Sequence, residues 1–536
     1  MYWDVVIVGG GGAALCAALS AAETGAKVLI LSKTKLGLGN CTAVAGGNFT
    51  VGVGGFRPEK HQEKTRETGR WINDAQLVEI LAAEGPTTLT ALTRYDVKMD
   101  LTPGMISVAP YAARVITAGT AFTLPLVRAI QDNPNISIEE RALVTEILIK
   151  DNKCHGVEYL DLKKGSVEQV RTKAAVVATG GFGQLYERTD NPVRTTGDGY
   201  ALIYNLGLTL TDMEFVQFFP LGFADPNLPG WMIPLSLIDH VPLTNNQGYE
   251  FLRAKLPEWG LKSGAGAERY ARDRSAQTVA KEIAAGRGAY LHLNKLPATA
   301  WESGIVADLE RMARGKIDLK RDPVAVAPTQ HFCCGGIVIG TNGETEVAGL
   351  FACGEVAAGV HGANRVGGNA LTELVVFGTR AGKTAAAYAA QAPAPSTAST
   401  RAGSSSTRLE KWQQGRGMNP KEFKSRLQAL ASQHLGVLRS AAGLNQALEE
   451  LEALRSELAN LSAPTLRELQ DAVEAENLYL IALMVARAAL FREESRGVHY
   501  REDFPAEDDQ NWRCNIYICR GTDGTPELIK RPLTAQ

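Results

Sequence analysis

The sequence predicts an α/β protein in which a domain with a parallel sheet carries an inserted α+β domain and is followed by a helical bundle. Three observations indicate this arrangement: a glycine-rich strand–turn–helix–strand unit at the start, a Pro-rich, aromatic stretch between about 220 and 334, and helical spacing beyond 408. A chain of 536 residues is too long for one hydrophobic core, so two to four domains are expected.

The first element is a strand at 4–8, DVVIV, followed by GGGGAA, an Ala-rich helix to about Thr24 and a second strand at 26–32. Gly9, Gly11 and Ala14 fit the spacing G-x-G-x-x-G/A, in which small residues let the backbone approach a pyrophosphate at a helix N-terminus. The position of this motif between two strands favours dinucleotide binding over a structural glycine turn, and predicts a Rossmann-like domain. The second strand ends in Ser32 and Lys33 rather than in an acidic residue that would bind a ribose, which disfavours a nicotinamide cofactor.

Two further strand-then-glycine segments lie at 173–186 and 349–368. Three glycine-rich turns that converge from distant parts of the chain suit a large, extended cofactor such as FAD. We therefore assign residues 1–220 and 335–390 to an FAD-binding domain, and the segment 221–334 to a capping domain that forms a lid over the substrate. The Pro/Ser/Thr/Ala-rich stretch 391–407 predicts a linker, 408–505 a helical domain that supports the fold or contacts another subunit, and 506–536 a C-terminal tail.

Bulk composition excludes several classes of partner. Lys and Arg number 56 against 58 Asp and Glu, so a net charge of −2 gives no reason to expect nucleic acid or an anionic membrane. The eight cysteines are scattered and match no iron–sulfur or zinc pattern, so no metal site is expected in this chain. The N-terminus lacks the basic region of a secretory signal, and no apolar run reaches the ~18 residues that a membrane helix needs. We expect a cytoplasmic protein without a direct membrane span, whose membrane contact, if any, is through a partner.

Several long motifs then carry a family resemblance. The segments VVIVGGGGAA, ATGG, TGDGYALIYNLG, GLFACGEVAAGVHGANRVGGNALTELVVFG and REESRGVHYREDFPAEDDQNW resemble, in this order, the flavoprotein subunits of succinate dehydrogenase and fumarate reductase. The same superfamily contains L-aspartate oxidase. The resemblance spans residues 1 to 520 and implies FAD as cofactor, a capping domain over the flavin ring and a C-terminal helical domain.

By position, the resemblance implies a set of cofactor-binding residues: Gly9, Gly11, Gly12, Ala14, Ser32, Lys33, Cys41, Thr42, Gly46, Gly47, Val144, Thr179, Gly180, Asp198, Glu355, Asn369, Ala370 and Leu371. Carboxylates such as Glu355 and Asp198 can accept hydrogen bonds from hydroxyl and amine groups, although Asp198 in TGDG would also make an ordinary turn. The respiratory members attach FAD through a histidine, where this sequence has Cys41 in NCTAVAGG. We therefore expect FAD to be bound non-covalently, with a cysteinyl attachment as the minor alternative.

The resemblance also implies the chemistry: a hydride passes between flavin N5 and one carbon of a C–C bond beside a carboxylate, and a proton passes to or from the neighbouring carbon. Arg365 matches the carboxylate clamp and His331 the second carboxylate ligand, while Arg272 matches the proton donor or acceptor. Because the pKa of arginine exceeds ~12 in water, that role requires a proton relay, through Glu268 or Asp273. Arg269 and Arg274 are rivals of Arg272 for which salt-bridge roles suffice.

The sequence departs from the dicarboxylate enzymes at the far end of the substrate pocket. Their motif QFHPTG is VQFFPLG here, so that Phe219 replaces a histidine and Leu221 a threonine, and Ile233 and Pro234 stand near the positions of a missing Thr-Glu pair. Each unpaired buried polar contact costs about 1–3 kcal/mol, which makes succinate and fumarate doubtful substrates. We expect a carboxylic acid with an apolar, aryl or CoA-thioester remainder near Phe219, and His240 as a candidate to replace the missing imidazole.

The sequence therefore predicts an FAD-dependent oxidoreductase that acts on a CH–CH group beside a carboxylate and passes electrons to an iron–sulfur subunit. Two alternatives stay open: an oxidase like L-aspartate oxidase, and a flavin electron-relay subunit without substrate chemistry. Retention of Arg272, His331 and Arg365 disfavours the relay. Vicinal Cys333 and Cys334 are more simply explained as small buried residues than as a redox pair.

Overall fold

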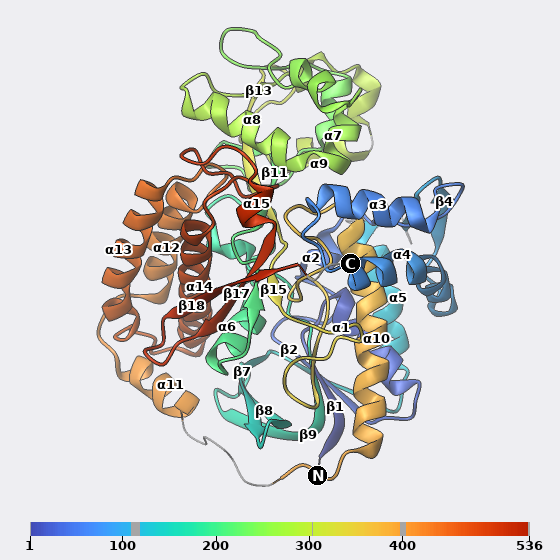
Figure 1. The fold of residues 1–536 in the computed structure, drawn as a ribbon, viewed down its shortest axis with the longest axis vertical. Helices are drawn as coiled ribbons and strands as arrows, with labels where there is room; N and C mark the ends of the chain where they lie inside the picture. The colour runs from blue at the N-terminus through green and yellow to red at the C-terminus, as the bar shows by residue number, and fades with distance from the viewer. Residues whose placement is uncertain (1, 109–117, 303, 397–403, 534–536) are drawn as a thin grey trace.

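The computed structural model describes residues 2–108, 118–302, 304–396 and 404–533. Residues 397–403 of the predicted linker and 534–536 of the predicted tail lie outside this range. Figure 1 shows three masses: an α/β part that contains the N-terminus, a part above it built from the middle of the chain, and a helical part beside both. No helix in the described ranges combines the length and the apolar character needed to cross a bilayer.

The α/β part begins with the predicted unit: β1 (Trp3–Val8), α1 (Gly12–Ala22) and β2 (Val28–Ser32). Among the described residues they belong to a seven-stranded sheet in which β6 (Ile136–Glu140), β2, β1 and β9 (Val167–Val177) run parallel, and β16 (Leu350–Ala352) pairs in parallel with β9. β7 (Ala142–Lys150) and β8 (Lys153–Asp161) extend β9 as an antiparallel meander. The predicted α/β class is confirmed.

This pairing explains how three distant glycine-rich segments meet. β1, β9 and β16 are parallel neighbours, so the turns that follow them emerge at the same edge of the sheet. α5 (Ala118–Gln131) and α10 (Asn369–Gln391) pack against α1, and α10 also contacts β1 and β9. Smaller elements fill the rest of this part: α2 (Cys41–Val44), α3 (Pro58–Thr68), α4 (Ala75–Thr90), α6 (Asp198–Asn205), and the sheet of β3 (Asn48–Thr50), β5 (Met105–Val108) and β4 (Met99–Thr102).

The middle of the chain forms its own α+β layer, at the top of Figure 1. Its sheet has the order β11 (Val216–Phe223), β14 (Val324–Cys333), β13 (Tyr290–Leu291) and β12 (Leu243–Thr244), with helices α7 (Gly264–Tyr270), α8 (Arg272–Ala284) and α9 (Gly304–Ala313). A separate hydrophobic cluster, which runs in sequence from Leu221 to Val326, fills its interior. β11 and β14 lead the chain into and out of this layer.

The helical part consists of α11 (Ser404–Gln414), α12 (Pro420–His434), α13 (Ala441–Leu458) and α14 (Leu466–Phe491). α14 begins with a capping box between Thr465 and Glu468, contacts α12 and α13, and packs against α6 of the α/β part. After it, α15 (Asp509–Trp512) precedes a hairpin of β17 (Cys514–Arg520) and β18 (Pro526–Pro532). The hairpin pairs with β10 (Leu210–Thr211), which also pairs with β15 (Gly336–Ile337), so the C-terminal segment is part of the fold.

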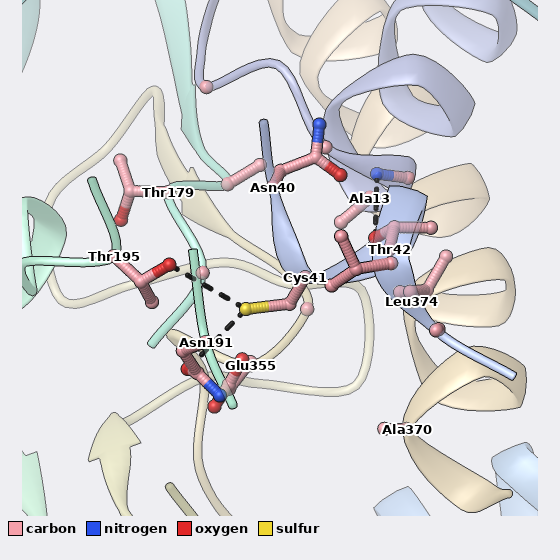
Figure 2. A pocket seen from close by; sticks show the side chains of 18 of the residues that line it. Ala13, Asn40, Cys41, Thr42, Thr179, Asn191, Thr195, Glu355, Ala370 and Leu374 are labelled. Atoms are coloured by element: carbon pink, nitrogen blue, oxygen red, sulfur yellow. Dashed lines mark hydrogen bonds between the residues drawn. The ribbon is translucent and has the colours of Figure 1, made fainter. Parts of the chain in front are cut away.

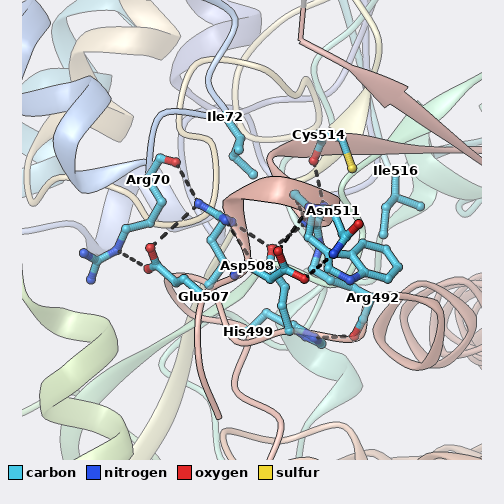
Figure 3. Close-up of polar contacts among 12 residues, drawn as sticks. Arg70, Ile72, Arg492, His499, Glu507, Asp508, Asn511, Cys514 and Ile516 are labelled. Carbon is cyan, nitrogen blue, oxygen red and sulfur yellow. Dashed lines mark hydrogen bonds and ion pairs between the residues drawn. The ribbon is translucent and has the colours of Figure 1, made fainter. Parts of the chain in front are cut away.

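A buried network of arginines and carboxylates fixes this segment (Figure 3). Arg492 is fully buried and bonds Glu214 at 2.7 Å and Glu494 at 2.9 Å. Glu494 in turn binds Arg496 at 2.8 Å, and Arg496 also reaches Asp509 at 2.8 Å. Glu214 lies just before β11 in sequence, so the network joins the C-terminal segment to the entrance of the inserted layer.

Replacing Arg492 with alanine should lower the free energy of unfolding by about 3–5 kcal/mol, because Glu214 and Glu494 would stay buried without a counter-charge. Arg455→Ala is the matched control: Arg455 lies on α13 with 55% of its side chain exposed and a 3.7 Å pair to Glu452, so about 0.5 kcal/mol or less is expected. Denaturant unfolding followed by circular dichroism measures both. Equal midpoints for the two variants would contradict the importance of the network.

Candidate functional site

A large cavity opens at the sheet edge where the glycine-rich turns meet, and extends to the inserted layer. Its walls come from the α/β part and from the inserted layer, and Figure 2 shows the region around α2. Among the residues that line it are Gly9, Gly10, Gly11, Gly12, Ser32, Lys33, Cys41, Thr42, Thr179, Gly180, Asp190, Asp198, Glu355, Trp231, Met232, Glu268, Arg272, His331 and Arg365.

One end of the cavity is the N-terminus of α1. Gly11 is the N-cap and provides no side-chain hydrogen bond, and the first turn of the helix has no acidic residue. Gly9 has φ +131°, and a Cβ there would lie 2.2 Å from the carbonyl oxygen of Ala178, so only glycine fits. Gly180, across the cavity, would gain a Cβ with no atom within 4 Å, which leaves open space. Exposed backbone N–H groups, the positive helix end and this space fit the pyrophosphate of a dinucleotide.

Lys33, directly after β2, lies in a charged cluster beside this end. Its Nζ is 2.7 Å from Asp198 and 3.1 Å from Glu474 of α14, and Asn477 of the same helix donates to Asp198 at 3.1 Å. Burial alone would lower the pKa of Lys33, but the two carboxylates raise it overall. The helical part therefore contributes residues that reach the cavity from behind its wall.

Figure 2 shows Cys41 at the start of α2, with its Sγ 3.4 Å from Asn191 Oδ1 and 3.7 Å from Thr195 Oγ1. Burial raises the pKa of this thiol well above its ordinary value, and the nearby carboxylate of Glu355 raises it further. The thiol is therefore protonated at neutral pH and is a poor nucleophile. Burial also raises the pKa of Glu355 to about 7, while the N–H of Cys333 donates to its Oε1 at 3.0 Å.

At the other end of the cavity two buried guanidinium groups share one acceptor. Arg365 donates to Gln217 Oε1 at 3.0 Å, and Arg272 approaches the same oxygen at 3.5 Å. Arg272 also donates from Nε to the carbonyl of Glu268 at 2.7 Å, whereas Arg365 Nε has no partner among the described residues. The described residues give neither guanidinium a carboxylate partner, in contrast to Arg492.

The electrostatics of this pair favour an anion. Burial and the charge of Arg272 lower the pKa of Arg365 to about 9, and burial lowers the pKa of Arg272, although Glu268 and Asp190 oppose this. Each guanidinium also lies over an aromatic ring: Arg365 over Phe332 at 4.5 Å and Arg272 over Phe219 at 4.8 Å. A bound carboxylate would offset the repulsion between the two cations and supply the missing acceptor.

His331 and Asp190 face the cavity beside these arginines. Nδ1 of His331 is 2.7 Å from Oδ2 of Asp190, and the edge of the imidazole meets the ring of Phe219 at 5.3 Å between centroids. Burial lowers the pKa of His331 overall, although Asp190 raises it. The histidine is therefore neutral at neutral pH before a ligand binds.

Most of the expected cofactor-binding residues line this cavity, and three do not. Ala14 is fully buried inside α1, and the side chain of Asn369 is bonded to His61 at 2.8 Å and to Thr65 at 2.9 Å. A Cβ on Gly47 would lie 2.5 Å from Val108, so this glycine allows close packing. Gly9, Gly11, Gly12, Ser32, Lys33, Cys41, Thr42, Gly46, Val144, Thr179, Gly180, Asp198, Glu355, Ala370 and Leu371 are all part of the lining.

The expected substrate pocket needs correction. His240 follows the short 3₁₀ helix Leu235–Asp239 as an exposed residue outside the cavity lining, so it does not replace the missing imidazole. Leu221 belongs to the interior of the inserted layer, and Phe219 lies behind His331 and Arg272. Trp231 and Met232, which no sequence motif singles out, form the apolar wall instead.

The rivals of Arg272 have other partners. Arg269 donates to the carbonyl of Gly104 at 2.7 Å, and so joins the inserted layer to the α/β part. Asp273 is paired with Arg70, whereas Glu268 lines the cavity, so Glu268 is the better placed of the two candidate relay acids.

Two polar residues of the site, Gln217 and Asp190, are absent from the set expected from the sequence. Gln217 stands inside VQFFPLG, two positions before Phe219, and Asp190 stands a few positions before TGDG. Their proximity to motifs with an expected role was the available signal. Neither residue type at these positions distinguishes a site residue from an ordinary buried one.

Comparisons with known proteins agree with this geometry. Residues 4–371 match the family model described as FAD binding domain, and residues 424–536 the model described as fumarate reductase flavoprotein C-term. The chain is 31% identical to the first of the named subunits of the CoM/CoB fumarate reductase of Methanothermobacter marburgensis, over 98% of both chains. It is 32% identical to L-aspartate oxidase of Streptomyces coelicolor, over 97% of this chain and 92% of that one. Among solved structures, a variant of FrdA from E. coli quinol fumarate reductase matches with a TM-score of 0.91 and 27% identity, over 100% of this chain and 97% of that one.

Gly9→Ala should yield protein that lacks bound FAD, because the new Cβ would displace the turn against Ala178 and misplace the N-terminus of α1. Gly25→Ala is the control: Gly25 has φ +86°, but a Cβ there would meet no atom within 4 Å, so only backbone strain is added. The ratio of flavin absorbance to protein absorbance after purification measures the difference. Full occupancy in Gly9→Ala would exclude this turn from the cofactor site.

Proposed function

Because the chain belongs to the succinate dehydrogenase and fumarate reductase flavoprotein superfamily, which also contains L-aspartate oxidase, we propose that it oxidises or reduces a C–C bond beside a single carboxylate. The family and the fold establish an FAD-dependent oxidoreductase. The observation that carries the finer proposal is the pair of buried guanidinium groups, Arg272 and Arg365, that share Gln217 and have no carboxylate partner among the described residues.

In this proposal Arg365 binds the substrate carboxylate. Its Nε is buried with no partner in the described part of the chain, and only 3% of the residue is exposed. A carboxylate placed there would therefore receive charge-assisted hydrogen bonds in a site with little water. His331 is the second ligand, and both it and Arg272 pack on the ring of Phe219. Gln217 orients both arginines, because its amide oxygen accepts from each and its amide nitrogen donates to Asn364 at 2.8 Å.

Arg272 is the proposed proton donor or acceptor. Burial lowers its pKa, which reduces the cost of releasing a proton compared with an arginine in water. Glu268 precedes it by one helical turn, lines the same cavity and raises the pKa of Arg272 through its charge. We assign Glu268 the role of passing protons between Arg272 and solvent. When bound, the flavin supplies the hydride acceptor or donor.

The walls around this site favour a substrate with one carboxylate and an apolar, aryl or thioester-bearing remainder. Trp231 and Met232 line the cavity from the inserted layer, and Phe219 takes the position of a polar ligand in the dicarboxylate enzymes. A second carboxylate against these side chains would lose hydrogen bonds worth about 1–3 kcal/mol each. Succinate and fumarate should therefore bind weakly.

The cofactor-binding residues named above are proposed FAD contacts, and the linkage is proposed to be non-covalent because the Cys41 thiol is held protonated. Electrons would pass to a separate iron–sulfur subunit; the relative from Methanothermobacter marburgensis is itself named as one subunit of its enzyme. A CoA thioester substrate falls within the proposed class, as does peripheral attachment to a membrane through the partner.

An oxidase like L-aspartate oxidase is the second candidate, favoured by the 32% identity to the Streptomyces coelicolor enzyme. Aspartate has two carboxylates and an ammonium group, for which Trp231 and Met232 offer no polar partner. A relay without substrate chemistry is the third candidate, and the arginine pair argues against it.

Anaerobic flavin spectroscopy on the purified protein decides among these candidates. A panel of saturated and unsaturated mono- and dicarboxylic acids and their CoA thioesters is mixed with the oxidised and the chemically reduced protein. We expect monocarboxylates with an apolar remainder to bleach or reoxidise the flavin, and aspartate and succinate to do neither. Reduction by aspartate would favour the oxidase, and a response to iron–sulfur proteins but to no acid would favour the relay.

Arg272→Ala should keep the flavin and lower turnover by about 100- to 10,000-fold, the usual contribution of a positioned proton donor. Arg365→Ala should mainly weaken substrate binding, by about 10- to 100-fold for the loss of hydrogen bonds to a charged group. Arg274→Ala, which removes a half-buried arginine of α8 outside the cavity lining, is the control and should leave both parameters near the wild-type values. Normal turnover by Arg272→Ala would refute the proton-transfer assignment.

A further inference from the structure

The pairing of His331 with Asp190 has a consequence for ligand binding. Nδ1 of His331 is engaged by Oδ2 of Asp190 at 2.7 Å, while no described residue bonds Nε2. Asp190 is itself held in place: its Oδ1 accepts from the amide of Asn191 at 2.9 Å, and that amide also donates to the carbonyl of His331 at 3.1 Å. The side chain of Asp190 is 7% exposed, and both residues line the cavity. The imidazole is therefore fixed with Nε2 toward the cavity.

We propose that Asp190 is a positioning residue that makes binding of the substrate carboxylate coincide with uptake of one proton by His331. The inference rests on the proposed function, since it requires a carboxylate between His331 and Arg365. With Nδ1–H donated to Asp190, the neutral imidazole presents a lone pair at Nε2, which would repel a carboxylate oxygen. A proton taken from solvent onto Nε2 turns this atom into a donor, and Asp190 balances the resulting positive charge.

A count of charges supports this coupling and limits the ligand to one carboxylate. The charged groups that face His331 from the described parts of the chain are Asp190, Arg272 and Arg365, and the ring packed against it is Phe219. Two guanidinium groups and Asp190 leave one positive charge. A monocarboxylate that arrives with its proton on His331 keeps that net charge of plus one, whereas a second carboxylate would lie close to Asp190 without a cation of its own.

The sign of the pH dependence follows. In the ligand-free site burial and the two arginines hold the pKa of His331 below its ordinary value, and a bound carboxylate raises it. Between these two pKa values, binding takes up a proton, so the dissociation constant rises by up to about tenfold for each unit of increasing pH. Below the lower value His331 is already charged, and above the higher value no proton is taken up, so the dependence vanishes on both sides.

Two measurements on the FAD-loaded protein test the proposal. Proton NMR of the ligand-free holoenzyme should show an Nδ1–H signal far downfield of the amide region, lost in both H331Q and D190N. Calorimetric titration with 3-phenylpropionate, in buffers of different ionisation enthalpy from pH 6 to 9, should show uptake of close to one proton at the pH of steepest dependence. D190N keeps a side-chain oxygen for Nδ1 but loses the charge, so it should bind the probe with little proton uptake across the same range.

D132N is the control, because Asp132 is an exposed carboxylate just after α5 and its loss should leave proton uptake unchanged. Proton uptake that persists in H331Q would assign the proton to Glu355, whose pKa is about 7, and would overturn the proposal. Unaltered uptake in D190N would likewise remove Asp190 from the coupling. Failure of the probe to bind at any pH would count against the proposed substrate class, while the NMR signal would still decide whether Asp190 positions His331.

Discussion

Two positive charges that share the amide oxygen of Gln217 are the constraint around which this protein is built. Gln217 comes from β11, Arg272 from the first turn of α8, and Arg365 from the loop between β16 and α10. The small residues around Arg365 are explained by this meeting: a Cβ on Gly367 would lie 3.1 Å from the guanidinium of Arg272, and Gly368 has φ +87° against Thr50. The chain of HGANRVGGN must run this close to the inserted layer for the two arginines to face one cavity.

The same type of side chain serves a different purpose in the C-terminal segment. Arg492 and Arg496 are as deeply buried as Arg365, but each of them is paired with a carboxylate within the fold, so those charges are neutralised on folding. Arg365 and Arg272 are left for a ligand to neutralise. Burial of a charge by itself therefore says little about function; the absence of a counter-charge within the described residues is what distinguishes the two groups.

The parts of the structure that depend on local pattern could be predicted from the sequence. The strand–glycine–helix unit, the convergence of the three glycine-rich turns and the C-terminal helices follow from periodicity and from parallel pairing. The substrate pocket could not be predicted in the same way. β11 has irregular register against β14 between Gln217 and Phe218 and again between Phe219 and Gly222, so side chains in VQFFPLG do not alternate simply between its two faces. Nothing in the linear sequence shows that Phe219 packs behind His331 while Trp231 and Met232 form the wall.

The pairing of Asp190 with His331 illustrates the same limit, because 141 positions separate the two residues and the parallel meeting of Thr189 with Gln330 brings them together. The contact of Lys33 with Glu474, and of Asp198 with Asn477, has a different kind of consequence. These bonds make one wall of the nucleotide cavity depend on the docking of the helical bundle. Occupancy by flavin and attachment of the bundle are thereby thermodynamically linked, so that free cofactor in solution stabilises an interface it never touches.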